Sequence, residues 1–150
     1  MTVESLNRQR VLHLLDAFAR GDLDTALSCC TDDVDFLSHA PIDVLPHMMP
    51  RRGRAALREL WEIVWSRYSE IRYKTPHIVA EGDDVAAYLH AYFKKRGNDR
   101  IVQFDMAVFY GFRNGLIAQI REIIDSYDLV QQVLEREIGP LIVGDKVRGT

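Results

Sequence analysis

The stretch from Ile101 to Asp128 constrains the fold more than any other part of the chain. Two apolar runs of β-forming residues flank Asn114 and Gly115, which tolerate the positive φ angles that a tight hairpin requires. The pattern predicts two long antiparallel strands at the centre of a sheet. Alternation divides the first strand into one face with Val102, Phe104, Met106, Val108 and Tyr110, and another with Gln103, Asp105, Ala107 and Phe109. Neither face is wholly polar.

Composition limits the class of protein. The 150 residues are expected to form one domain, residues 1–150, and the hydrophobic share of 47% beside a charged share of 27% is typical of a soluble globular chain. A formal net charge of -3 without a dense basic cluster disfavours nucleic acid as a partner. No apolar run approaches the roughly 18 residues of a membrane span, and the N-terminus lacks an apolar signal region. We therefore expect a cytoplasmic protein with no membrane partner.

Periodicity places the other elements. Apolar residues at helical spacing predict helices over Glu4–Arg20, Asp22–Cys30 and from Gly53 to Tyr68, and another from Asp128 that Gly139-Pro140 stops. Alternation predicts strands over Val34–Ser38, Ile71–Ala80 and Val85–Lys95. The segment His39–Arg52 holds three of the five prolines and several apolar residues, so it is expected to fold as a lid over a hydrophobic opening. The tail to Thr150 is expected to be ordered only by a partner chain.

This order of elements predicts an α+β fold in which a curved, mostly antiparallel sheet wraps around three helices, with a further C-terminal helix. Several short motifs resemble the NTF2-like superfamily, and within it the SnoaL-like polyketide cyclases and the limonene epoxide hydrolases. These motifs are Phe18–Asp24, Asp32–Val34, Gly53–Leu57, Glu81–Asp83, Asn114–Ile117 and Arg121–Asp125. The resemblance implies a cone with a small-molecule pocket inside it, and commonly a homodimer built on the outer face of the sheet.

The resemblance does not fix the reaction. The epoxide hydrolases activate water with two acids bridged by an arginine, and the aligned positions here hold His90, Glu122 and Tyr88. Only Glu122 keeps its chemical type. The catalytic positions of the ketosteroid isomerases align with Ser38, Leu14 and Ala107, so that set is absent as well. The SnoaL-like cyclases are the least contradicted analogy.

A candidate site follows from strand alternation. Tyr88, His90 and Tyr92 share a face that is expected to meet Asp105 and its neighbours on the next strand. We expect Asp105 and His90 to transfer protons inside the cavity, with Tyr88 as a hydrogen-bond donor and Glu122 as an auxiliary acid. The expected substrate-binding residues are Phe36, Ser38, Trp61, Trp65, Tyr92, Gln103 and Phe109.

Each of these assignments has a structural alternative. Because one bulge reverses strand parity, His90 and Asp105 could instead lie on the outer face of the sheet, together with Gln103. There they would pair with each other, with Lys94 or Arg100, in water or across a dimer interface. Glu122 could form an exposed ion pair with Arg121. Trp61 and Trp65 could serve mainly as core residues.

The sequence therefore leaves two functions open. No histidine or cysteine spacing suggests a metal site, and no glycine-rich loop suggests a nucleotide, so neither a metal nor another cofactor is expected. The first function is binding of a small, largely apolar cyclic or isoprenoid-like molecule with cofactor-free acid-base catalysis of isomerisation, cyclisation, dehydration or hydrolysis. The alternative is a non-catalytic ligand-binding or dimerisation module of the same fold.

Overall fold

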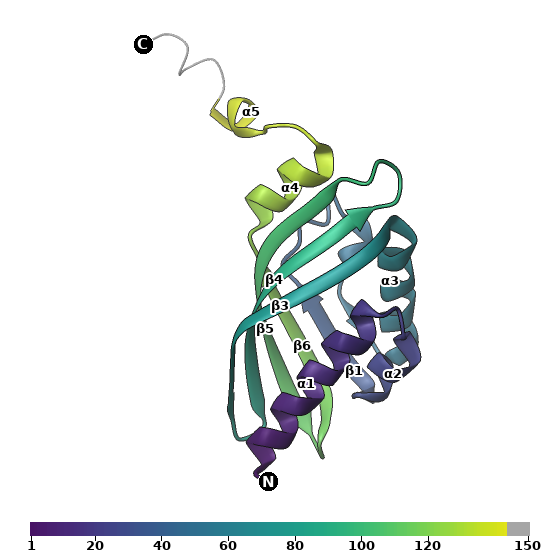
Figure 1. The fold of residues 1–150 in the computed structure, drawn as a ribbon, viewed down its shortest axis with the longest axis vertical. Helices are drawn as coiled ribbons and strands as arrows, with labels where there is room; N and C mark the ends of the chain where they lie inside the picture. The colour runs from purple at the N-terminus through teal and green to yellow at the C-terminus, as the bar shows by residue number, and fades with distance from the viewer. Residues whose placement is uncertain (144–150) are drawn as a thin grey trace.

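The computed structural model describes residues 1–143, which form one curved six-stranded sheet with helices on its concave side (Figure 1). The strands lie in the order β2-β1-β6-β5-β4-β3. Their bounds are β1 Cys30–Ser38, β2 Arg51–Arg52, β3 Tyr68–Glu81, β4 Asp84–Lys95, β5 Ile101–Arg113 and β6 Leu116–Ile124. All neighbouring strands are antiparallel except β1 and β6, which pair in parallel. The predicted α+β class and the mostly antiparallel sheet are confirmed.

The central hairpin is the one predicted from Asn114 and Gly115. Both residues have positive φ angles, 52° and 77°, and the strands on either side pair from Arg113 with Leu116 to Met106 with Ile124. Gly115 lacks a Cβ and Asn114 tolerates the left-handed conformation, so this backbone has little steric cost and the turn forms here. The hairpin is the middle of the sheet, since β1 extends it on one side and β4 on the other.

Three helices precede or interrupt the strands and pack against one face of the sheet (Figure 1). They are α1 Val3–Ala19, α2 Leu23–Ser28 and α3 Arg54–Arg67. The carboxylate of Asp22 accepts a hydrogen bond from the Thr25 backbone N–H at 3.1 Å, so Asp22 caps α2 as its sequence position predicts. The apolar stripes of α1 and α3 supply much of the core, including Val11, Leu14, Leu57 and Leu60.

The C-terminal helix differs from its prediction. It divides into α4 Ser126–Leu134 and α5 Gly139–Val143, with Glu135 left-handed at φ 55° between them. Asp125 caps the start of α4 by accepting from the Asp128 N–H, which moves the helix start upstream. Proline is well tolerated in the first turn of a helix, so Gly139-Pro140 begins α5 instead of ending a longer helix. Most of the tail to Thr150, residues 144–150, lies outside the described residues.

The segment after β1 covers the open end of the cone, as predicted for a lid. It contains a short 3-10 turn over Pro46–Met48 and the two-residue strand β2, and Leu45 is buried in the core. The backbone N–H of His39 donates to the Glu122 carbonyl at 2.9 Å, so the segment leaves the sheet directly beside β6. In the part of the chain that is described, no helix has both the length and the apolar composition to cross a membrane.

Candidate active site

An apolar cavity of about 100 Å³ lies between the concave face of the sheet, α1, α3, the lid and α4. Its walls carry aliphatic and aromatic side chains from every one of these elements, among them Leu14, Phe18, Phe36, Leu45, Trp61, Val64, Phe93, Phe104, Met106 and Leu129. Among residues 1–143, the ionisable groups on its walls are Glu122, His47, Tyr68, Tyr73 and Tyr110. Polar chemistry inside the cone is therefore confined to a few positions.

The parity expected for β4 and β5 is reversed in the structure. The residues of β5 that line the cavity are Phe104, Met106, Val108 and Tyr110, and β4 contributes Leu89 and Phe93. The other face points away from the helices. Tyr88, His90, Tyr92, Gln103, Asp105 and Phe109 therefore lie on the outer face of the sheet, so their expected position in the cavity is wrong. The physical reason is burial: the cavity-lining side chains of β4 and β5 are apolar apart from Tyr110, whereas His90, Gln103 and Asp105 belong to the outward faces.

Asp105 and His90 nevertheless form the pair that the sequence suggests. The Asp105 carboxylate lies 2.5 Å from Nδ1 of His90, and it accepts a hydrogen bond from the Tyr88 hydroxyl at 2.5 Å. These two contacts hold the pKa of Asp105 below its usual value, the Tyr88 bond contributing most. The pair matches the outer-face alternative, since the Asp105 side chain is 51% exposed to solvent.

The other residues expected to bind substrate differ in their contacts and in whether they line the cavity. The indole N–H of Trp65 donates to the Phe18 carbonyl at 3.1 Å, and Trp65 does not line the cavity, so its packing is structural. The ring of Tyr92 lies beneath the cations of Arg72 and Lys74, 5.9 and 5.7 Å from its centroid. Phe36 and Trp61 do line the cavity, as expected.

Glu122 is the acid that the fold places inside. It lines the cavity from β6, opposite Ser38 in the parallel pairing with β1. Burial among apolar side chains raises the pKa of Glu122 to about 7, while the neighbouring Ser38 hydroxyl offsets part of this shift. Arg121 points the other way and binds the Asp35 carboxylate at 2.9 Å, which excludes the Arg121–Glu122 surface pair.

Two tyrosines near Glu122 were not singled out from the sequence. Tyr73 and Tyr110 line the same cavity, and burial together with the nearby Glu122 charge raises the pKa of both hydroxyls. Both hydroxyls are consequently protonated donors at neutral pH. Their signal in the sequence was weak, because Tyr110 follows an otherwise apolar alternation and reads as a core residue.

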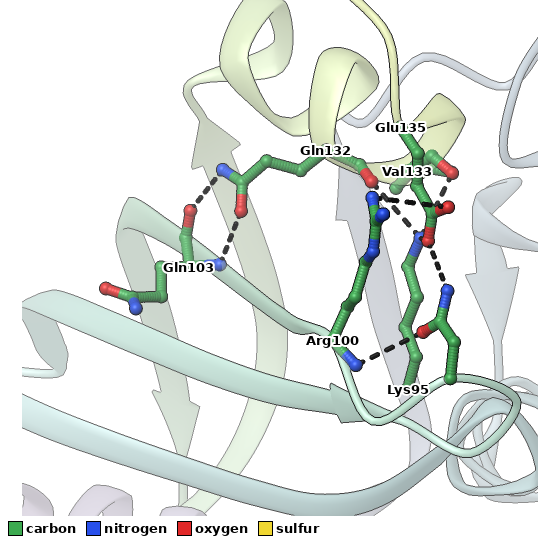
Figure 2. A network of polar contacts seen from close by, with 7 residues as sticks. Lys95, Arg100, Gln103, Gln132, Val133 and Glu135 are labelled. Atoms are coloured by element: carbon green, nitrogen blue, oxygen red, sulfur yellow. Dashed lines mark hydrogen bonds and ion pairs between the residues drawn. The ribbon is translucent and has the colours of Figure 1, made fainter.

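The helix α4 closes the cavity wall beside β5, where Leu129 reaches inward. Figure 2 shows the polar contacts that hold it. Gln132 accepts from the Gln103 backbone N–H at 2.7 Å and donates to its carbonyl at 2.5 Å. The Glu135 carboxylate accepts hydrogen bonds from the Lys95 ammonium at 3.0 Å and from the Asn98 side-chain amide at 2.6 Å. It also lies 3.5 Å from the Arg100 guanidinium. The backbone of Gln103 thus has a structural role at the cavity wall.

Nothing in residues 1–143 is arranged as a metal centre, since no group of three histidine, cysteine or acidic side chains converges there. The site consists of a half-buried acid, Glu122, two tyrosine hydroxyls and a lid histidine, His47, in an apolar cavity. Such a set can bind an apolar molecule and move a proton on it.

The fold places the chain in the NTF2-like fold class, in which a curved sheet and its helices surround an apolar cavity. A crystal structure of an NTF2-like protein of unknown function from Burkholderia pseudomallei K96243 has a TM-score of 0.78 at 17% identity, covering 89% of this chain and 98% of that one. The family model of the SnoaL-like domain matches residues 11–120. The chain belongs to the SnoaL-like family.

Two further solved structures are similar. One, from Rhodopseudomonas palustris, is provisionally assigned as an isomerase and shares 26% identity with a TM-score of 0.77, over 87% of this chain and 97% of its own. The other is an epoxide hydrolase of the LEH-like type from M. tuberculosis, with 21% identity and a TM-score of 0.73, over 93% of this chain and 97% of its own. No curated protein matches the sequence significantly.

Proposed function

We propose that this SnoaL-like chain binds a small, largely apolar cyclic or isoprenoid-like molecule in its internal cavity and transfers a proton on it without a cofactor. The observation that carries the proposal is the position of Glu122, an acid with a pKa of about 7 on the wall of an apolar cavity. A group whose pKa lies near the working pH is present in both protonation states, so it can act as base or acid.

The surroundings of Glu122 support a role in proton transfer. Tyr73 and Tyr110 line the same cavity with protonated hydroxyls, and the charge of Glu122 lies near enough to raise the pKa of both. The acid can remove a proton from the ligand, while a tyrosine stabilises the charge that develops on a ligand oxygen. The apolar remainder of the wall, including Phe36 and Trp61, favours a ligand with an apolar body.

The cavity volume bears on how the ligand enters. A protein cavity of roughly 150 Å³ accepts benzene, whereas this cavity measures about 100 Å³. A cyclic ligand therefore requires displacement of a wall. The lid is the best candidate, because the backbone hydrogen bonds of Val44, Leu45 and Met48 all stay within the lid.

Two reactions can be tested directly, proton abstraction beside a carbonyl and hydrolysis of an epoxide. Proton abstraction beside a carbonyl would be detected as incorporation of solvent deuterium into 2-cyclohexenone, followed by NMR. Hydrolysis would be detected as diol formed from cyclohexene oxide, the chemistry suggested by the name of the M. tuberculosis relative. Both probes are small, neutral and cyclic.

Glu122→Gln is the variant that tests the proposal. We expect it to lower the rate of whichever reaction the wild type performs by about 10²-fold to 10⁴-fold, because the amide cannot accept a proton. The wild-type rate should also depend on one group with a pKa near 7, and this dependence should vanish in the variant. Asp105→Asn is the comparison variant: loss of turnover there, with Glu122→Gln active, would move proton transfer to the outer face. Binding of both probes without reaction would favour the non-catalytic module.

We also propose that the outer face of the sheet forms a homodimer. Tyr88, Phe109 and Ile123 expose large apolar surfaces on this face, around the Tyr88–Asp105–His90 cluster. Apolar groups of this size gathered on one face are typical of an interface between subunits. The resemblance to NTF2-like proteins supports the same arrangement.

A further inference from the structure

His47 lines the cavity from the lid, but the proposed proton transfer gives it no function. It lies in the short 3-10 turn Pro46–Met48 and is half-buried. Its backbone carbonyl accepts a hydrogen bond from the Arg51 guanidinium at 2.9 Å, which anchors the turn while the imidazole lines the cavity. The lid itself begins at His39, whose N–H is bound to the Glu122 carbonyl, and the side chains of His47 and Glu122 line the same cavity.

The Nδ1 atom of His47 is buried and lacks a hydrogen-bond partner in the described chain. The other atoms in this condition are the Thr31 hydroxyl and Nε of Arg51, so two of the three belong to the lid. A buried polar atom without a partner costs about 1 to 3 kcal/mol. A ligand oxygen in the cavity would supply the missing partner of Nδ1.

Burial and the charges around His47 keep its imidazole neutral. Burial, together with the smaller effects of the Arg67 and Arg51 cations, lowers the pKa of His47 to about 4. The imidazole is therefore neutral at physiological pH and can donate one N–H. The acidic groups nearby are Glu122, across the cavity wall, and Glu59, which lies 3.6 Å from Arg51 at the surface. Because the two arginine cations disfavour a further positive charge, His47 faces the cavity as a neutral donor.

We propose that His47 is a further catalytic residue, whose Nδ1–H binds the ligand oxygen on which negative charge develops when Glu122 removes a proton. This inference rests on the proposed function of Glu122. It names the substrate class as a neutral, apolar molecule with a carbonyl beside an acidic C–H. The Glu122 carboxylate takes the proton from carbon, the C–H electron pair forms the enolate C=C bond, and the carbonyl π electrons move onto the oxygen that His47 binds. Where a C=C bond of the ligand is conjugated with the enolate, the charge extends to the far end of that bond, and return of the proton from Glu122 to that carbon shifts the double bond and completes an isomerisation.

The test uses 4-nitrophenol, whose absorption spectrum distinguishes phenol from phenolate and whose anion imitates an enolate oxygen. The full chain carrying Glu122→Gln serves as the reference, because the amide removes the competing negative charge. We expect this protein to bind the phenolate at least about tenfold more tightly than the double variant that also carries His47→Phe, as a charged hydrogen bond is lost. His39→Phe, an exposed histidine of the same lid, is the matched control and should leave phenolate binding unchanged.

The outcomes separate the two proposals. Equal phenolate affinity with and without His47→Phe overturns the role of His47 and leaves that of Glu122 intact. Failure of the cavity to bind the probe in either the wild type or Glu122→Gln overturns both. If the His47→Phe chain does not fold, the ¹⁵N NMR signal of His47 Nδ1 in Glu122→Gln decides instead. A shift on adding 4-nitrophenol supports the contact, and an unchanged signal overturns it.

Discussion

Glu122 experiences two opposing influences on its carboxyl group. Burial in the apolar cavity favours the neutral acid, and the Ser38 hydroxyl favours the carboxylate, with burial the stronger. Its neighbour Arg121 lies on the opposite face of β6 and is bound to Asp35, so it does not neutralise Glu122 as a direct partner. At the scale of single residues, the site is defined by Glu122, an acid that forms no ion pair within residues 1–143.

This environment predicts a pH-dependent stability difference. The folded pKa of about 7 exceeds the ordinary value of 4.5, so the folded state holds the proton more tightly and wild-type stability falls as pH rises between these values. The loss amounts to at most roughly 3.5 kcal/mol, at 1.36 kcal/mol per pKa unit. We expect Glu122→Gln to remove this loss. In urea unfolding, the free energy of unfolding of the variant should therefore increase relative to that of the wild type as pH rises from about 4 to about 8. Glu62→Gln, at an exposed position of α3, should follow the wild-type curve. If the unfolding free energies of the wild type and Glu122→Gln changed in parallel with pH, the raised pKa of Glu122 would be contradicted.

At the scale of elements, α4 is held at the cavity wall by polar contacts more than by burial. Leu129 is its one buried residue, while Gln132 and Glu135 bind β5 and the β4–β5 turn. Glu135 also carries a left-handed backbone, which a residue of its type adopts at some steric cost. The contacts of its carboxylate with Lys95, Asn98 and Arg100 help to maintain this conformation (Figure 2).

Glu135→Gln should loosen α4 without unfolding the sheet. The amide retains one acceptor oxygen but loses the charge that attracts Lys95 and Arg100, so local opening becomes more frequent. We expect several-fold faster hydrogen exchange of the α4 amides, measured by mass spectrometry or NMR, with the amides of β4 and β5 unchanged. Glu137→Gln, an exposed position just beyond, is the matched control. Unchanged exchange in α4 would show that the network does not hold the helix.

At the scale of the whole molecule, the sheet has two faces with different tasks. The concave face packs on α1 and α3 and encloses the cavity, whereas the convex face carries Phe109, Ile123 and the Asp105–His90 pair. Residues that follow one another along β5 therefore serve different purposes. Phe104 and Met106 contact the cavity, and Asp105 between them faces outward.

The outer face gives a prediction for assembly. Phe109→Glu places a charge at the centre of the proposed interface, next to Arg121 in the strand register, and removes apolar contact area. We expect the dimer dissociation constant to rise about tenfold or more in sedimentation equilibrium. Leu12→Glu, which makes the same kind of change on the exposed side of α1, should leave assembly unaltered. A monomeric wild type, or a dimer insensitive to Phe109→Glu, would refute this interface.

The sequence by itself determined the main helices and strands and their order, because alternation, helical spacing and turn residues are local signals, but it did not determine the division of the C-terminal helix into α4 and α5. It predicted the Asn114-Gly115 hairpin, the Asp22 cap, the lid, and the presence of an acid at Glu122. It also predicted that Asp105 meets His90, since cross-strand register follows from the β4–β5 connection. It did not determine which face of these strands was inside. Alternation has a period of two and divides a strand into two faces without saying which one the helices cover. Only the packing of α1, α3 and the lid on the concave side decided that Glu122, Tyr73, Tyr110 and His47 share a cavity, and that Asp105 and His90 do not.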